Sequence, residues 1–266
     1  MNMANDELEG KHGVQSLEVG MSILRAMATG RRSMMLKDIA QAAGMPPSKA
    51  HRYLVSLIRS GLVEQDRLTS RYDLGPFALN LGLVALDRVD RIRLGLMAIN
   101  DLRDATNETV ALSVWSDGGP VVVRWERPRR PITVNVVTGT HLSLLRSAGG
   151  RVFAAWLPER QTEALIAREL DSGKAPAGVA SMDDARALLA QVREVGMAVI
   201  TGDYFARGVE AAAAPVFNFN NEITMAIAMV GVEGSMDLAP DGATLLALRS
   251  AAADLSRRLG ATPAQD

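Results

Sequence analysis

The sequence contains no cysteine, which excludes disulfide bonds, thiolate metal sites and a cysteine nucleophile. Histidine is scarce, and His12, His51 and His141 are too far apart in the sequence to predict a metal site. No stretch approaches the run of about 20 apolar residues that a membrane-spanning helix needs. The polar N-terminal residues have no apolar core of the kind found in signal peptides. We therefore expect a soluble cytoplasmic protein that carries no metal and no cofactor.

Catalytic motifs are absent as well. The chain has no GxSxG nucleophile elbow, no P-loop, no Rossmann glycine pattern and no HExxH zinc motif. Asp203 and Glu210 offer two carboxylates, but no third group that would tune their pKa values is apparent nearby. We expect no enzymatic activity, and an enzyme built on the C-terminal half stays as an alternative interpretation.

The net charge of −1 conceals an uneven distribution along the 266 residues. Between Lys11 and Gly75, ten Lys and Arg residues face five Asp and Glu residues, whereas the rest of the chain is mildly acidic. A chain of this length with 48% apolar residues can form two domains, each with its own core. A basic N-terminal domain is the part in which contact with nucleic acid is expected.

Residues 36–61, LKDIAQAAGMPPSKAHRYLVSLIRSG, have the pattern of a helix-turn-helix. Gly44 suits a helix end that needs positive φ, and Pro46 and Pro47 can begin the next helix but cannot continue the previous one. An amphipathic helix is predicted before this motif, over residues 14–28, and a short β-hairpin after it, over residues 62–74. This order of elements is that of a winged helix-turn-helix, whose second helix enters the DNA major groove.

The polar residues of this segment are the candidate DNA contacts. Lysine and arginine are the residues that most often read guanine, with roughly 1–3 kcal/mol of discrimination per good contact. Arginines in the hairpin turn are placed to meet phosphate or a minor groove. His51 is either a phosphate contact or a packed helix residue. The predicted DNA-binding residues are Lys37, Ser48, Lys49, His51, Arg52, Arg67 and Arg71.

The remainder of the chain reads as a linker helix followed by an α+β domain. Residues 77–86 form a helix that is apolar on most sides, so Phe77, Leu81 and Val84 are expected to pair with a second copy of the chain. Strands arranged in hairpins and interspersed helices predict an antiparallel sheet. The expected helices are 91–106, 148–157, 160–170, 182–195 and 241–259, and the expected strands are 109–115, 121–125, 132–137, 208–217 and 222–229.

Several short motifs, in this order and at these spacings, resemble the IclR (isocitrate lyase regulator) family of bacterial transcription factors. They include Val14-Gln15-Ser16-Leu17, His51-Arg52-Tyr53-Leu54, Arg71-Tyr72-Asp73-Leu74-Gly75, Ser147-Ala148-Gly149-Gly150-Arg151 and Ala213-Ala214-Pro215-Val216. The resemblance implies a winged helix-turn-helix at 13–75, a linker and dimerisation helix at 76–90, and a GAF-like effector domain at 91–262. It also implies an effector-responsive regulator, more often a repressor, that binds a pseudo-palindromic operator as a dimer or tetramer. Residues 1–12 lack periodicity and are expected to form a disordered tail.

The effector domain departs from the family pattern. Relatives that sense small organic acids place an Asp, a Cys and two Ser around the ligand, and the matching positions here are Ile200, Ala211, Ala228 and Val230, while Leu145 replaces a His. Because a buried carboxylate without hydrogen-bonding partners costs on the order of several kcal/mol, small acids are disfavoured. The resemblance therefore points to a larger effector that is mostly apolar or aromatic, oriented by the amides around Ala148 and Gly149 and by Trp115 or Trp125. A regulator that activates transcription in response to a small organic acid is the alternative.

Overall fold

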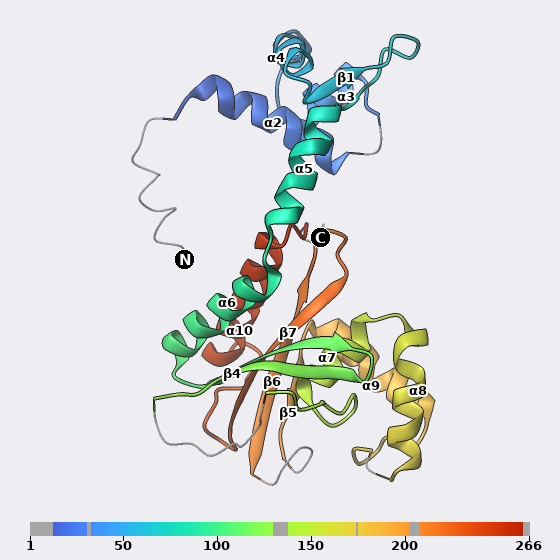
Figure 1. The fold of residues 1–266 in the computed structure, drawn as a ribbon, viewed down its shortest axis with the longest axis vertical. Coiled ribbons are helices and arrows are strands. Elements are labelled where there is room, and N and C mark those ends of the chain that lie inside the picture. Colours follow the sequence, from blue (N-terminus) through green and yellow to red (C-terminus); the bar gives the residue numbers. More distant parts are fainter. Residues whose placement is uncertain (1–12, 31–32, 130–137, 174, 203–207, 263–266) are drawn as a thin grey trace. The chain divides into compact units, whose positions relative to one another are not determined.

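The computed structural model describes residues 13–30, 33–129, 138–173, 175–202 and 208–262, and the chain divides into two compact units between Val89 and Asp90 (Figure 1). The tail expected over residues 1–12 and the strand expected over 132–137 lie outside the described residues. Within the described ranges, no helix combines the length and the apolar character needed to cross a bilayer.

The N-terminal unit is a winged helix-turn-helix followed by a helix. Its elements are α2 (Gln15–Thr29), α3 (Leu36–Ala42), α4 (Pro47–Arg59), β1 (Val63–Gln65), β2 (Tyr72–Leu74) and α5 (Pro76–Arg88). The two strands are antiparallel and pair Val63 with Leu74. A single antiparallel bridge pairs Met34, two residues before α3, with Tyr72 of this small sheet. The predicted order of three helices and a hairpin is confirmed.

The apolar positions that predict these helices form the core of the unit. Side chains three or four residues apart share one face of a helix, and the apolar faces of the three helices meet in this core. Ile23 of α2, Ile39 of α3 and Leu54 of α4 are all fully buried there. Gly44 adopts a φ of 63°, the left-handed conformation that ends α3 at little cost for glycine. The turn that sets α4 across α3 therefore forms as expected.

The start of α5 lies against the end of α4. The amide of Phe77 donates a 3.0 Å hydrogen bond to the carbonyl oxygen of Gly61, and the amide of Gly75 donates one of 2.9 Å to Leu62. A Cβ atom at position 75 would lie 3.0 Å from the carbonyl carbon of Gly61 and closer still to its oxygen. Glycine at position 75 thus permits the close approach of two backbone segments.

The C-terminal unit contains a five-stranded antiparallel sheet with helices on both faces (Figure 1). The strand order is β4-β3-β7-β6-β5. The helices α6 and α10 pack on one face, and α7 packs on the other with α8 and α9 outside it. The elements are α6 (Arg91–Thr106), β3 (Thr109–Ser116), β4 (Gly119–Glu126), α7 (Ala148–Trp156), α8 (Glu159–Asp171), α9 (Met182–Val195), β5 (Ala198–Ile200), β6 (Val209–Phe217), β7 (Ile223–Val232) and α10 (Ala243–Arg258).

The α+β architecture with an antiparallel sheet is confirmed, and one strand was not predicted. That strand is β5, which pairs with β6 at the edge of the sheet and sets Ile200 opposite Ala211. With only three residues, β5 is too short to show an alternating pattern in the sequence. Its position matters because it adds Ile200 to the sheet face that α7 covers.

Candidate nucleic-acid interface and effector cavity

The second helix of the helix-turn-helix, α4, presents its polar N-terminal residues to solvent. Pro47 occupies the first turn, where a missing N–H costs nothing. Ser48, His51 and Arg52 are exposed, Lys49 is half-buried, and Ala50 lies on the buried face. The first turn contains no acidic residue that would repel phosphate. The structure therefore brings these four predicted DNA contacts together at one end of α4.

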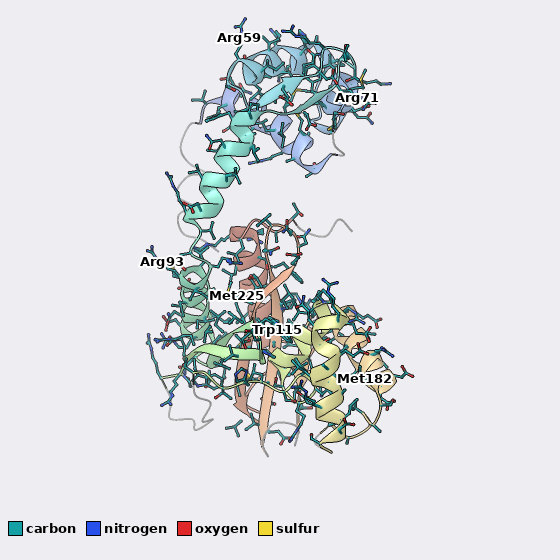
Figure 2. The ribbon with its side chains drawn as sticks, turned by 45° about the vertical axis from the view of Figure 1, so that its right-hand side comes forward. Arg59, Arg71, Arg93, Trp115, Met182 and Met225 are labelled. Carbon is teal, nitrogen blue, oxygen red and sulfur yellow. The ribbon has the colours of Figure 1, made fainter. Side chains whose placement is uncertain are left out.

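The wing and α3 supply the remaining predicted contacts. Lys37 and Arg67 are exposed. Arg71 is exposed too (Figure 2). Its Nη1 donates a 3.0 Å hydrogen bond to the carbonyl oxygen of Ser33. Arg71 therefore also helps to hold the residues before α3 against the wing.

The turn of the wing is organised by Asp66. Its Oδ1 accepts hydrogen bonds of 2.7 Å from the amide of Leu68 and 3.2 Å from that of Thr69. The bond from the Leu68 amide has the largest effect, followed by those from the amide and the hydroxyl of Thr69. Together they hold the pKa of Asp66 below its ordinary value because they favour the charged form. The turn presents Arg67 and leaves Leu68 almost wholly exposed, at 96%.

The helix α5 exposes the apolar side chains that were expected to mediate dimerisation. In the single chain, Phe77 is 48% exposed, Leu81 55% and Val84 39%. Leu79 and Leu83 are exposed as well. A helix with so much apolar surface is typical of a segment that is covered by a partner. Pairing of two chains through α5 stays a prediction.

The C-terminal unit contains a cavity between the sheet and the N-terminal end of α7. The space amounts to about 560 Å³ when counted out to the open solvent at its mouth. Its lining is mostly small and apolar. The lining residues are Ala111, Ser113, Val122, Trp125, Leu142, Arg146, Ser147, Ala148, Gly149, Ile200, Val209, Ala211, Ala228 and Val230.

Strand register explains why distant positions share this cavity. Trp125 of β4 lies opposite Ala111 of β3, which lies opposite Ala228 of β7. In the neighbouring row, Val230 of β7 lies opposite Ala211 of β6. Residues two apart on a strand point to the same face, so both rows face α7. Seven of the nine predicted effector residues line the cavity: Trp125, Ala148, Gly149, Ile200, Ala211, Ala228 and Val230.

Two predicted effector residues, Trp115 and Leu145, do not line it. Trp115 packs on Phe153 of α7, with ring centroids 5.9 Å apart at 46°, and so contributes to the core (Figure 2). Leu145 is fully buried in the same core. Leu145 belongs to the turn before α7. The next residue of this turn, Arg146, lines the cavity instead.

The cavity lining also contains polar side chains that were not predicted. Arg146, Ser147 and Ser113 all line the cavity, and none of them is among the nine predicted effector residues. Ser147 caps α7: its hydroxyl accepts from the amide of Gly150 at 3.0 Å and donates to the carbonyl oxygen of Ser143 at 2.7 Å. A guanidinium group can balance a carboxylate, so an anionic group on a larger ligand is compatible with this lining. Arg146 directly precedes the motif Ser147-Ala148-Gly149-Gly150-Arg151, and this adjacency could have identified Arg146 as a cavity residue from the sequence.

Metal binding has no support in the part of the chain that the structure describes, where no group of three or more metal-ligating side chains gathers.

Comparison with known proteins decides the family. A family model described as the IclR helix-turn-helix domain matches residues 16–67, and one described as the bacterial transcriptional regulator IclR C-terminal domain matches residues 84–257. The chain belongs to the IclR family of transcriptional regulators. The predicted family is thereby confirmed, together with a DNA-binding helix-turn-helix.

Individual IclR-family proteins are similar over nearly the whole chain. The glycerol operon regulatory protein of Streptomyces griseus is 33% identical over 93% of this chain and 97% of its own length. The transcriptional repressor IclR of Escherichia coli is 27% identical over 82% of this chain and 80% of its own. The crystal structure of Pseudomonas aeruginosa HmgR aligns with a TM-score of 0.82 and 37% identity, covering 94% of this chain and all of that one.

Proposed function

We propose that this IclR-family regulator is a cytoplasmic repressor whose affinity for operator DNA is controlled by a mostly apolar, aromatic compound bound between the sheet and α7. The observation that carries the proposal is the lining of the cavity. Ala111, Ala211 and Ala228 form a floor of small side chains on adjacent strands, and Trp125 stands beside them. Small apolar side chains with one aromatic wall suit a flat apolar ring.

The DNA-binding half of the proposal rests on α4 and the wing. The exposed side chains of Ser48, His51 and Arg52, with the half-buried Lys49, face solvent at the end of α4 that such motifs insert in the major groove. Arg67 at the wing contributes charge for the phosphate backbone. Two chains paired through the apolar face of α5 would present two such helices to the half-sites of a pseudo-palindrome.

Control follows from a difference in affinity. An effector that binds one conformation of the dimer more tightly than another shifts the population toward it, and DNA affinity changes by the corresponding coupling free energy, typically 1–3 kcal/mol. The name of the E. coli relative supports repression as the direction. The proposal assigns no catalytic activity to the chain. The alternative is an activator that senses a small organic acid, for which Arg146 in the cavity lining is a favourable group.

The proposal is tested with the full chain and an operator selected from random DNA fragments by the protein itself. Calorimetric titrations with benzoate, 4-hydroxybenzoate, glyoxylate and pyruvate compare aromatic with small acids, and DNA binding is measured with and without each compound. We expect an aromatic compound to bind and to release the operator. Tight binding of glyoxylate or pyruvate alone would favour the alternative, and tighter DNA binding with the effector would contradict repression by the unliganded protein.

A further inference from the structure

The tip of the wing carries an apolar side chain that the rest of the chain leaves uncovered. Leu68 is 96% exposed, whereas no other large apolar side chain among the described residues exceeds 65%. Single apolar residues are common on protein surfaces, so exposure alone assigns no role to Leu68. What distinguishes Leu68 is its position in the turn between β1 and β2 of the DNA-binding unit, next to the exposed Arg67.

The backbone of this turn is held by several hydrogen bonds. The amide of Asp66 donates to the carbonyl oxygen of Arg71 at 2.8 Å, and the amide of Ser70 donates to the carbonyl oxygen of Asp66 at 2.8 Å. The carboxylate of Asp66 accepts from the amide of Leu68 at 2.7 Å. Ser70 has a φ of 57°, a left-handed conformation that is uncommon for residues other than glycine. A turn built in this way presents Leu68 in a fixed direction, which reduces the entropy cost of inserting its side chain into a partner.

The tip combines positive charge with apolar surface. Residues 67–70 contain one cation, one apolar side chain, two hydroxyl groups and no carboxylate. The carboxylate of Asp66, which precedes them, is occupied by two backbone amides of the turn. The other acidic residues of the wing, Glu64 and Asp73, form a cross-strand pair nearer its base. The tip therefore suits a partner whose rim is anionic and whose interior is apolar.

The minor groove of duplex DNA has this character, because phosphates line its edges and sugar rings form its walls. It is about 6 Å wide, too narrow for a helix or a two-stranded ribbon, so only side chains from the tip of a hairpin can enter it. β1 packs against α4, and both α4 and the loop after β1 lie at the end of the N-terminal unit that points away from α5 (Figure 1). With α4 in the major groove, this loop is placed to meet an adjacent minor groove.

We infer that Leu68 enters the minor groove as an apolar wedge between two base pairs and bends the operator, while Arg67 contacts the flanking phosphates. The inference rests on the DNA-binding half of the proposed function and is independent of the effector. Leucine is among the side chains that minor-groove proteins insert between base pairs, which partly unstacks them. Unstacking is easiest at pyrimidine–purine steps such as TA and CA. Leu68 thus adds a preference for such a step, although leucine has no hydrogen-bonding group with which to read a base edge.

The experiment uses the full-length chain and compares Leu68→Ser with Leu68→Met and Thr69→Ala. Leu68→Ser removes the apolar side chain, and Leu68→Met keeps one that can insert. Thr69→Ala is the matched control, because it changes the neighbouring residue of the same turn and leaves Leu68 in place. Each protein selects binding sites from random duplex DNA. Circular dichroism verifies that the variants are folded, which the exposure of Leu68 leads us to expect.

Bending and unstacking are measured on the site that the wild-type protein selects. Energy transfer between fluorophores at the two ends of the fragment reports the bend. Fluorescence of 2-aminopurine, placed at the adenine of the selected step, rises when that base is unstacked. A second fragment, in which the step is replaced by the stiffer AA step, tests the preference directly.

Wild-type protein and Leu68→Met should select a TA or CA step at a fixed distance outside the bases that α4 reads, whereas Leu68→Ser should select those bases alone. Replacing the step by AA should weaken wild-type binding about tenfold and leave binding of Leu68→Ser unchanged. Leu68→Ser should also bend the fragment less and leave 2-aminopurine quenched. Thr69→Ala should resemble the wild type in all of these measurements.

Three results would overturn the inference alone and leave operator binding intact. They are a wild-type selection without a preferred step, retention of the step preference and the bend in Leu68→Ser, and an equal loss of both in Thr69→Ala. If Leu68→Ser kept the step preference and changed the oligomeric state measured by light scattering, Leu68 would belong to a protein contact instead. If the wild-type protein selected no DNA sequence at all, the DNA-binding half of the proposed function would fail together with the inference.

Discussion

The carboxylate of Glu169 on α8 accepts a 2.7 Å hydrogen bond from the hydroxyl of Ser143, 26 residues earlier in the chain. The same carboxylate accepts from the amides of Leu144 at 2.6 Å and Leu145 at 3.0 Å. From the other side, Nε of Arg151 donates to the carbonyl oxygen of Leu145 at 2.7 Å. The turn that carries Arg146 into the cavity is therefore held by side chains from two helices.

Replacing Glu169 should loosen this turn. In Glu169→Gln, one acceptor oxygen becomes an NH₂ group that faces donors, and we expect the C-terminal unit to lose about 1–3 kcal/mol of unfolding free energy. Tryptophan fluorescence during urea unfolding measures this unit selectively, because Trp115, Trp125 and Trp156 all lie within it. Glu163→Gln, at an exposed position of the same helix, is the control and should change the free energy little. Equal effects of the two substitutions would contradict the role assigned to Glu169.

Arg52→Ala should weaken binding to the selected operator more than binding to random DNA. Arg52 is exposed near the start of α4, and loss of a base contact costs roughly 1–3 kcal/mol on the specific site. Gel-shift titrations on both DNAs provide the measurement. Arg67→Ala is the matched comparison: a phosphate contact should be lost on both DNAs, with a salt dependence that is less steep by about one unit. An equal loss on both DNAs for Arg52→Ala would exclude base recognition by that residue.

The order of the wing should depend on pH through Asp66. The hydrogen bonds from Leu68 and Thr69 lower the pKa of this carboxyl below its ordinary value of 3.8. A lowered pKa in the folded state means that the charged form stabilises the turn above pH 3.8, and that this contribution is lost as pH falls through the lowered pKa. Asp66→Ala should therefore increase amide exchange at Leu68 and Thr69 at neutral pH. Unchanged exchange there would contradict the assignment.

Two alanine substitutions in and beside α5 should have opposite effects on the N-terminal unit. Gly75→Ala forces a Cβ against the backbone of Gly61, and we expect a cost of about 1–3 kcal/mol. At Gly82, within α5, a Cβ meets nothing within 4 Å, so alanine should stabilise the helix by about 0.5–1 kcal/mol. Hydrogen exchange of buried α4 amides such as that of Leu54 reports both effects. A destabilising Gly82→Ala with a neutral Gly75→Ala would refute the close approach.

Elements with a clear local period could be predicted from the sequence, and contacts between distant segments could not. The helix over 182–195 was predicted, and in the structure Ser181 and Asp184 form a reciprocal capping box at its start. The two tryptophans show the limit. Trp115 and Trp125 look alike in the sequence, and their different roles arise from strand pairing, which sets Trp125 opposite Ala111 and Trp115 opposite Pro120.

Arg146 shows a second limit. Its place in the cavity depends on how the turn before α7 is held by Glu169, and a hydrogen bond across 26 residues leaves no periodic signal. The resemblance to the family allowed Ile200, Ala211, Ala228 and Val230 to be predicted as effector residues, and all four line the cavity. It gave no such prediction for Arg146 and Ser113, which line the cavity as well. Side-chain direction in turns is set by tertiary contacts rather than by local propensity.

The meeting of Gly61 and Gly75 also determines how a signal can travel. Because α5 begins on the backbone that directly follows α4, a rotation of the linker helix would be passed to the DNA-reading helix. Val89 and Asp90, which are not helical, join α5 to the C-terminal unit. In the dimer that we propose, a change of backbone angle at this two-residue joint would alter the distance between the two reading helices.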